Sequence, residues 1–258
     1  MKQPSTSLNS SNARTIVNSL KDIPGGTVLD VATGDGDFIL MLKKTLRDYD
    51  SFIGIDVSGK EIEAAKKNMG EAAEFFEMNA ENIEFEDGYF DTVCMANSLH
   101  HLEDVDLVLG EMKRVLKPGG HFILQEMFCD GEQTEAQKSD ILSHNLDADI
   151  DSVLGIPHRW TFTRNEIKDI IAKLGLRKSV IFESSRYPKC LFCDDWIRCE
   201  DPKNDEMVAF VIEEIDGNLQ RLSDQERISF QEEAEKIKEM IGERGTASAS
   251  ILFIIGKK

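Results

Sequence analysis

The stretch TVLDVATGDG at residues 27–36 decides the fold. Its first five residues form an apolar run of β-strand composition, and its glycines form a turn in front of a helical pattern. Small residues between a strand and a helix let the backbone approach a bulky ligand, because no Cβ atoms intervene. Ala32, Gly34 and Gly36 supply such residues at alternate positions. A tight strand–helix turn without a ligand would show the same glycines, so they leave both interpretations open.

A carboxylate at the end of the next strand favours the ligand. The apolar run 51–55 is followed by Asp56, which lies 22 residues after Gly34. In doubly wound folds an acidic residue here accepts hydrogen bonds from ribose hydroxyls, although it could also serve as the first carboxylate of a helix. The loop matches neither G-x-G-x-x-G nor G-x-x-x-x-G-K-[ST]. We therefore expect a ligand that contains adenosine and no phosphate.

Strand and helix patterns alternate along the chain, which predicts an α/β fold with right-handed crossovers and a mostly parallel, doubly wound sheet. We expect a tail and a short helix at 1–24 and one domain at 25–258. The strands are expected at 27–31, 51–55, 74–78, 90–95, 121–126, 177–182 and 247–255. Two insertions are expected, a cover at about 128–160 and acidic helices at about 187–245, the latter before the last strand.

The charge and the composition limit the classes of partner that this protein is expected to bind. The net charge is −18, and half of the excess lies in residues 194–240, where 15 Asp and Glu face 6 Lys and Arg. A nucleic-acid partner is disfavoured, because binding phosphates needs a basic surface. Five cysteines cannot all pair, the first twelve residues are polar, and no apolar run approaches 18 residues. We expect a cytoplasmic protein with reduced thiols and no membrane partner.

The apolar positions of the acidic helices recur at helical spacing. They are Val208, Val211, Ile212, Ile215 and Leu219. We expect them to pack on the domain or on a second subunit, as in a homodimer through this insertion, rather than to form a core of their own.

Five stretches in register resemble the class I S-adenosylmethionine-dependent methyltransferases. They are VLDVATGDG (28–36), IGIDVS (53–58), MNAENIEF (78–85), FDTVCMANSLHHL (90–102) and LKPGGHFIL (116–124). The ending ASASILFIIGKK also resembles the family's last, antiparallel strand. The resemblance implies seven strands in the order 3-2-1-4-5-7-6 and S-adenosylmethionine as the cofactor.

The resemblance also assigns roles around the first loop. It implies that Asp30 orients the loop and lies near the amino group of the cofactor. Ala32, Gly34 and Gly36 would line the methionine and ribose side, with Ala32 in place of a commoner glycine.

Further roles follow from the later stretches. Asp56 would hold the ribose hydroxyls, and Val57 would pack on the adenine. Asn79 stands where the family usually has Asp, and its amide oxygen can still accept a hydrogen bond from the adenine amino group. The backbone of Ala80 would pair with the ring, and Asn97 would contact the methionine portion.

Two adjacent histidines are candidate bases. His100 and His101 follow the fourth strand, at the carboxyl edge where ligands bind in open α/β sheets. One could remove a proton from the methyl acceptor, or both could simply pack at the start of the next helix. His144 and His158 fall in or near the cover segment, and for His158 we favour an inter-helix contact over contact with an acceptor.

No metal site is predicted. Asp147, Asp149 and Asp151 lie two residues apart in a predicted helix and therefore do not share one face. The remaining candidate metal ligands are Cys190, Cys193 and Cys199. Apolar residues lie between them in the sequence, which favours ordinary thiols over a zinc or metalloid site.

The sequence therefore predicts a methyltransferase that acts on a small-molecule acceptor by in-line displacement. Three alternatives stay open: methylation of a protein side chain, methylation of a thiol or metalloid, and a non-catalytic protein that binds S-adenosylmethionine as a regulator.

Overall fold

The computed structural model describes residues 9–192 and 201–258. Seven strands form one sheet in the order β3-β2-β1-β4-β5-β7-β6, which confirms the predicted fold class and strand order. Only β7 runs antiparallel to its neighbours, and the other pairings given for the sheet are parallel. The strands are β1 (Thr27–Val31), β2 (Ser51–Asp56), β3 (Glu74–Glu77), β4 (Phe90–Ala96), β5 (Leu116–Met127), β6 (Arg177–Ser184) and β7 (Ile251–Lys257).

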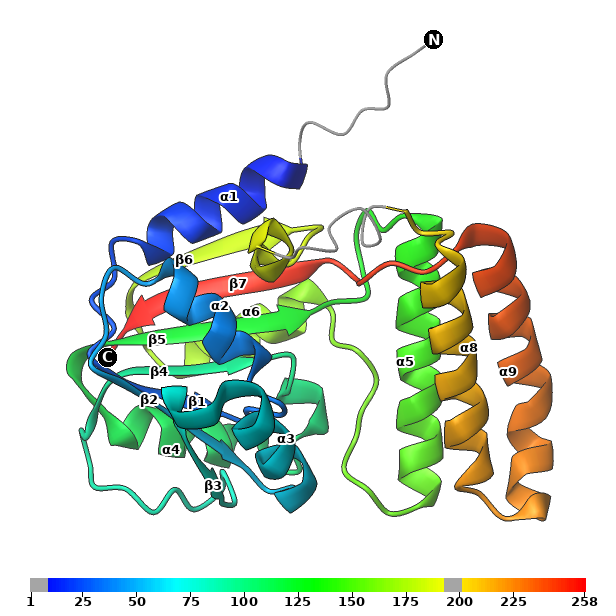
Figure 1. The fold of residues 1–258 in the computed structure, drawn as a ribbon, viewed down its shortest axis with the longest axis horizontal. Coiled ribbons are helices and arrows are strands. Elements are labelled where there is room, and N and C mark those ends of the chain that lie inside the picture. The colour runs from blue at the N-terminus through cyan, green and yellow to red at the C-terminus, as the bar shows by residue number, and fades with distance from the viewer. Residues whose placement is uncertain (1–8, 193–200) are drawn as a thin grey trace, which may run out of the picture.

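Helices cover both faces of the sheet (Figure 1). The α-helices are α1 (Asn9–Leu20), α2 (Asp37–Thr45), α3 (Gly59–Met69), α4 (Val105–Val115), α5 (Glu135–Val153), α6 (Arg164–Lys173), α8 (Asp205–Gln220) and α9 (Asp224–Arg244). Short 3-10 turns are η1 (Gly70–Ala72), η2 (Leu99–His101) and η3 (Pro188–Phe192). One hydrophobic cluster joins the sheet to α4 and α6, and a second joins it to α1, α2 and α3.

Side-chain caps set the starts of several helices. Ser58 precedes α3 and accepts a hydrogen bond from the Glu61 backbone N–H at 3.3 Å. Thr163 and Glu166 form a complete capping box at the start of α6. Such caps satisfy backbone N–H groups that have no partner within the helix, which is why helices begin at these residues.

The acidic segment forms a unit that the sequence did not predict. Helices α8 and α9 stand beside α5 at one end of the sheet (Figure 1). The three helices share a third hydrophobic cluster, in which Leu146, Ile215, Leu219 and Ile237 are buried. The apolar positions of the acidic helices therefore pack on the domain, as expected, although the sequence did not identify α5 as the helix that covers them.

The last strand starts later than predicted, at Ile251 instead of 247. The residues before it are bound by side chains of the segment around α5: Ala249 N–H donates to Asp140 Oδ2 at 2.9 Å, and Ser250 N–H donates to Gln133 Oε1 at 3.2 Å. These backbone groups therefore serve to hold the three-helix unit against the sheet.

None of the helices in residues 9–192 and 201–258 has both the length and the apolar character needed to cross a membrane.

Candidate active site

A cavity of about 860 Å³ opens at the carboxyl ends of β1, β2 and β4. It is lined by eight of the nine residues assigned above to the cofactor: Asp30, Ala32, Gly34, Asp56, Val57, Asn79, Ala80 and Asn97. Gly36 is not among the lining residues. It stands at the start of α2 with φ 90°, and a Cβ there would come within 3.2 Å of Met69 Cγ. Gly36 therefore serves the backbone turn and the packing behind the loop.

The first loop leaves open space for a ligand. Gly34 has φ 52°, and a Cβ built on it would meet no atom within 4 Å. Ala32 has φ 53°, which is rare for a residue with a side chain and costs free energy. The next residue, Thr33, is held by a hydrogen bond from its backbone N–H to Ile55 O at 2.9 Å. Ala32 and Gly34 therefore keep left-handed backbone conformations, in which their backbone borders the cavity.

Asp56 is fixed in place at the end of β2. Its Oδ2 accepts from the Gly34 backbone N–H at 3.0 Å, and its Oδ1 accepts from the Ser58 N–H at 2.9 Å. Each carboxylate oxygen keeps capacity for a further hydrogen bond. Val57, beside it, lines the cavity with 73% of its surface exposed, so an apolar side chain is available to a ring.

Two asparagines have different bonding states. Asn79 Oδ1 already accepts a hydrogen bond from the Glu81 N–H at 2.9 Å and keeps one lone pair. Asn97 has φ 50°, and its Oδ1 is buried with no hydrogen-bond partner. A buried acceptor without a donor is costly. Because Asn97 lines the cavity, its oxygen fits a ligand that brings a donor such as an amino group.

Asp30 links the first loop to the sheet. Its Oδ2 accepts from Thr33 Oγ1 at 2.7 Å, and its Oδ1 accepts from Cys94 Sγ at 3.4 Å. Burial, and then the charge of Asp56, raise the pKa of Asp30 to about 7, although the two hydrogen bonds oppose the rise. The carboxyl group therefore orients the loop, as the resemblance implies.

The segment after β6 supplies two of the lining residues that were not predicted. Tyr187 and Lys189 follow β6, and Lys189 Nζ donates to Asp37 Oδ2 at 2.7 Å. Burial raises the pKa of Tyr187 above its usual value. A signal did exist, because β6 runs parallel to β5 and its carboxyl end therefore lies at the same edge of the sheet.

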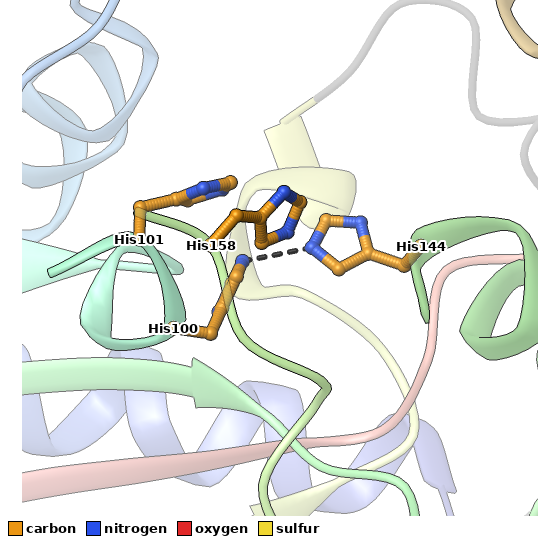
Figure 2. Close-up of side chains that lie close together, drawn as sticks. All are labelled: His100, His101, His144 and His158. Carbon is orange, nitrogen blue, oxygen red and sulfur yellow. Dashed lines mark hydrogen bonds between the residues drawn. The ribbon is translucent and has the colours of Figure 1, made fainter. Parts of the chain in front are cut away.

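All four histidines considered above meet at the rim of this cavity (Figure 2). His100 and His101 come from η2, His144 from α5, and His158 from the segment between α5 and α6. His101 lines the cavity, whereas the side chain of His100 is 1% exposed and lies behind it. The sequence did not reveal this cluster, because three separate segments contribute to it.

Two carboxylates hold the histidine rings. Glu126 is fully buried on β5; its Oε1 lies 2.6 Å from His100 Nδ1, and its Oε2 accepts from the Leu99 N–H at 2.9 Å. Asp151 Oδ2 lies 2.8 Å from His158 Nδ1. Burial and the charges of the neighbouring imidazoles lower the pKa of His144 to about 3 and also lower that of His101. His101 and His144 are therefore neutral near pH 7.

Each of the three aspartates weighed for metal binding has another partner. Asp147 accepts from Asn218 Nδ2 at 2.7 Å, Asp149 accepts from Trp160 Nε1 at 2.8 Å, and Asp151 holds His158. Among the cysteines, Cys193 and Cys199 lie outside the described residues.

Known proteins resemble both the sequence and the fold. Residues 29–124 match the family model described as methyltransferase domain. The ubiquinone/menaquinone biosynthesis C-methyltransferase UbiE of Geotalea daltonii is 36% identical over 118 residues, which are 44% of this chain and 50% of that protein. The demethylmenaquinone methyltransferase of Bacteroides fragilis is 34% identical over 120 residues, which are 44% of this chain and 48% of that protein. The chain thus spans about half the length of these relatives.

Solved structures match over more of the chain. The YcgJ protein of Bacillus subtilis superposes with a TM-score of 0.52 at 19% identity, over 96% of this chain and 98% of that one. A phosphoethanolamine N-methyltransferase of Haemonchus contortus, in complex with S-adenosylhomocysteine, gives a TM-score of 0.55 at 17% identity, over 96% of this chain and 52% of that one.

The sheet order, the cavity and the matched segment together define the class of domain. The chain carries a class I S-adenosylmethionine-dependent methyltransferase domain. The cofactor of this class is S-adenosylmethionine, as the resemblance implied.

Proposed function

We propose that this protein transfers a methyl group from S-adenosylmethionine to a small-molecule acceptor. The observation that carries the proposal is the cavity edge formed by Gly34 and Asp56, whose carboxylate is fixed by two backbone N–H groups. It offers acceptors for ribose hydroxyls and no phosphate cradle, which suits an adenosyl sulfonium.

The residues present fit this cofactor. Asp56 would hold the ribose, Val57 would lie against the adenine, and the unpartnered Asn97 Oδ1 would accept from the amino group. Asn79 and the Ala80 backbone would contact the adenine edge, while the backbone of Ala32 and Gly34 would border the methionine portion. When bound, S-adenosylmethionine supplies a methyl group that its sulfonium already activates.

The protein's main task is then alignment in a dry site. Such positioning can lower a barrier by about 7–11 kcal/mol. Ile156 and Pro157 of the cover segment line the cavity and would keep water from it. Of the two candidate bases, only His101 lines the cavity, so removal of a proton from the acceptor would fall to this residue rather than to His100.

The acceptor is proposed as a small molecule because Ile156 and Pro157 of the cover line one side of the cavity, and the net charge of −18 opposes a nucleic acid. The relatives named for quinone biosynthesis match over 44% of this chain. We therefore treat a demethylmenaquinone-like quinone as the first acceptor to test. A second copy could pair through α8 and α9, where Phe210 and Ile228 are 53% and 76% exposed.

Two measurements test the proposal. Calorimetry of the full chain should detect S-adenosylhomocysteine and no nicotinamide dinucleotide. Incubation with methyl-labelled S-adenosylmethionine and size-separated cell extract should then send the label to small molecules. Label in the protein fraction would favour a side-chain acceptor, and binding without any transfer would favour a regulator.

A further inference from the structure

Four imidazoles converge on one point at the rim of the cavity. One ring nitrogen of each of His100, His101, His144 and His158 lies within 4.8 Å of the others. Figure 2 shows the rings turned toward a common centre. His100 is buried, His144 and His158 are partly buried, and His101 is the exposed member on the cavity side. A metal ion needs such a convergence of donor atoms.

The ring nitrogens at this centre are not all satisfied by hydrogen bonds. His158 Nε2 is buried without a hydrogen bond, and the side chain is 3% exposed. His100 Nε2 lies 2.8 Å from His144 Nε2. A single N–H···N bond satisfies that pair and still leaves His158 Nε2 unpartnered. An ion bound between the rings would use all of these lone pairs at once.

The carboxylates behind the rings are arranged as in metal sites. Glu126 contacts His100 Nδ1 at 2.6 Å, and Asp151 contacts His158 Nδ1 at 2.8 Å. A carboxylate that takes the Nδ1–H fixes the tautomer and leaves Nε2 free to coordinate, which is the usual second layer of histidine metal sites.

The same carboxylates supply compensating charge. Glu126 is fully buried. Within the described residues its partners are His100 and the Leu99 N–H, and no Lys or Arg side chain pairs with it. Asp151 shares its charge with Arg221, whose Nη2 lies 2.6 Å from Oδ1. The charge of a dication between the four rings would be balanced mainly by Glu126 and partly by Asp151.

We propose that His100, His101, His144 and His158 bind a divalent transition-metal ion of the zinc class. Imidazole nitrogen suits zinc and its neighbours, and four ligands suit tetrahedral coordination. The site goes beyond the proposed methyl transfer and replaces the expectation that the protein has no metal site. It ties α5 and the following segment to the end of β4, and His101 brings the ion to the cavity rim. Coordination would occupy the lone pair of His101, so the role of base proposed for this residue applies to the metal-free protein.

The direct test is metal binding by the full chain. The protein is stripped with a chelator and titrated with Zn²⁺ in competition with a chromophoric indicator, and the bound metal is counted by atomic emission. We expect one equivalent per chain. Co²⁺ should give visible bands of tetrahedral nitrogen ligation and no thiolate charge-transfer band.

Matched variants locate the ion. His158→Gln should abolish stoichiometric binding, whereas His121→Gln, which changes the one histidine outside the cluster, should leave it unchanged. Asp151→Asn should weaken Zn²⁺ affinity about 10–100-fold, the usual loss on removing a carboxylate behind a histidine ligand. Asp149→Asn, on the same helix with its carboxylate on Trp160, should not.

These experiments test metal binding independently of the proposed methyl transfer, because none of the measurements requires turnover. The proposal is overturned if the wild-type chain retains no zinc, or if Co²⁺ shows thiolate bands that Cys190→Ser removes. It is equally overturned if the folded Asp151→Asn and Asp149→Asn proteins bind zinc alike. Should His158→Gln fail to fold, the wild-type cobalt spectrum and the aspartate pair still decide.

Discussion

The two sides of the cavity are built in different ways. On the cofactor side, backbone atoms and one fixed carboxylate come from loops that directly follow β1 and β2. On the acceptor side, side chains of His101, Ile156 and Tyr187 come from segments scattered over almost ninety residues. The first side lies within residues 29–124, which match the family model, whereas Ile156 and Tyr187 of the second side lie outside that segment. Ligand class and acceptor identity are therefore decided by different parts of the molecule.

The largest effect should come from the three-helix unit on the acceptor side. Leu219→Ala removes a side chain that is 3% exposed in the cluster shared by α5, α8 and α9. We expect a loss of about 2–5 kcal/mol in the free energy of unfolding, from lost burial and a cavity. Urea unfolding followed by circular dichroism measures it.

Ile228→Ala is the control for this change, because Ile228 on α9 is 76% exposed. Its effect should stay within about 0.5 kcal/mol. We also expect the folded Leu219→Ala protein to bind S-adenosylhomocysteine as the wild type does. Loss of that binding would mean that the two sides are not independent.

A smaller effect is expected on the cofactor side from Asp56→Ala. Loss of the hydrogen bonds to a charged acceptor should weaken binding of S-adenosylhomocysteine by about 1.5–3 kcal/mol. Calorimetry measures this, with Asp50→Ala as the control, since Asp50 is exposed just before β2. Unchanged affinity in Asp56→Ala would show that the ribose does not lie at this carboxylate.

The smallest effect concerns the contact between the three-helix unit and the sheet. Burial, and then the charge of Glu214, raise the pKa of Asp140 from 3.8 to about 6, although its bond to Ala249 N–H opposes this. The folded protein then holds the proton more tightly than the unfolded chain, so stability falls as the pH rises from about 4 to about 6. Above pH 6 the charged carboxylate of Asp140 lowers the stability of the folded protein by the full amount.

Asp140→Asn should remove that cost while keeping an acceptor for the Ala249 N–H. We expect the variant to be about 1–2 kcal/mol more stable than the wild type at pH 7, with a smaller difference at pH 4. Thermal unfolding at both pH values measures it, and Asp169→Asn, at an exposed carboxylate on α6, is the control. A difference that does not change with pH would contradict the titration of Asp140.

Sequence patterns predicted most of the fold. Alternating strands and helices predicted the sheet, and the capping pattern at Thr163 predicted where α6 begins. For α8 and α9 they predicted the helices and their apolar positions but not the partner, because helical spacing reveals an apolar face and not the surface that covers it. Nothing in residues 205–241 indicates that α5 is the partner.

In the candidate site, too, local features could be predicted from the sequence and contacts between distant segments could not. Gly34 and Asp56 could be found by sequence, because a turn after one strand and an acid after the next are local features that the parallel sheet brings together. Gly36 was assigned to the cavity although its role is in the turn behind it. The convergence of His144 and His158 on His100 has no local signature, since 44 and 58 residues separate them from it.

The order of hydrophobic and small residues along the chain was enough to specify a twisted parallel sheet with an adenosyl edge, because those features depend on short-range backbone preferences. Only the packed molecule decided that five distant polar side chains, His100, His101, His144, His158 and Glu126, would share one desolvated spot. Burial and mutual distance give these groups their chemistry, and both come into being when the cover folds onto the sheet.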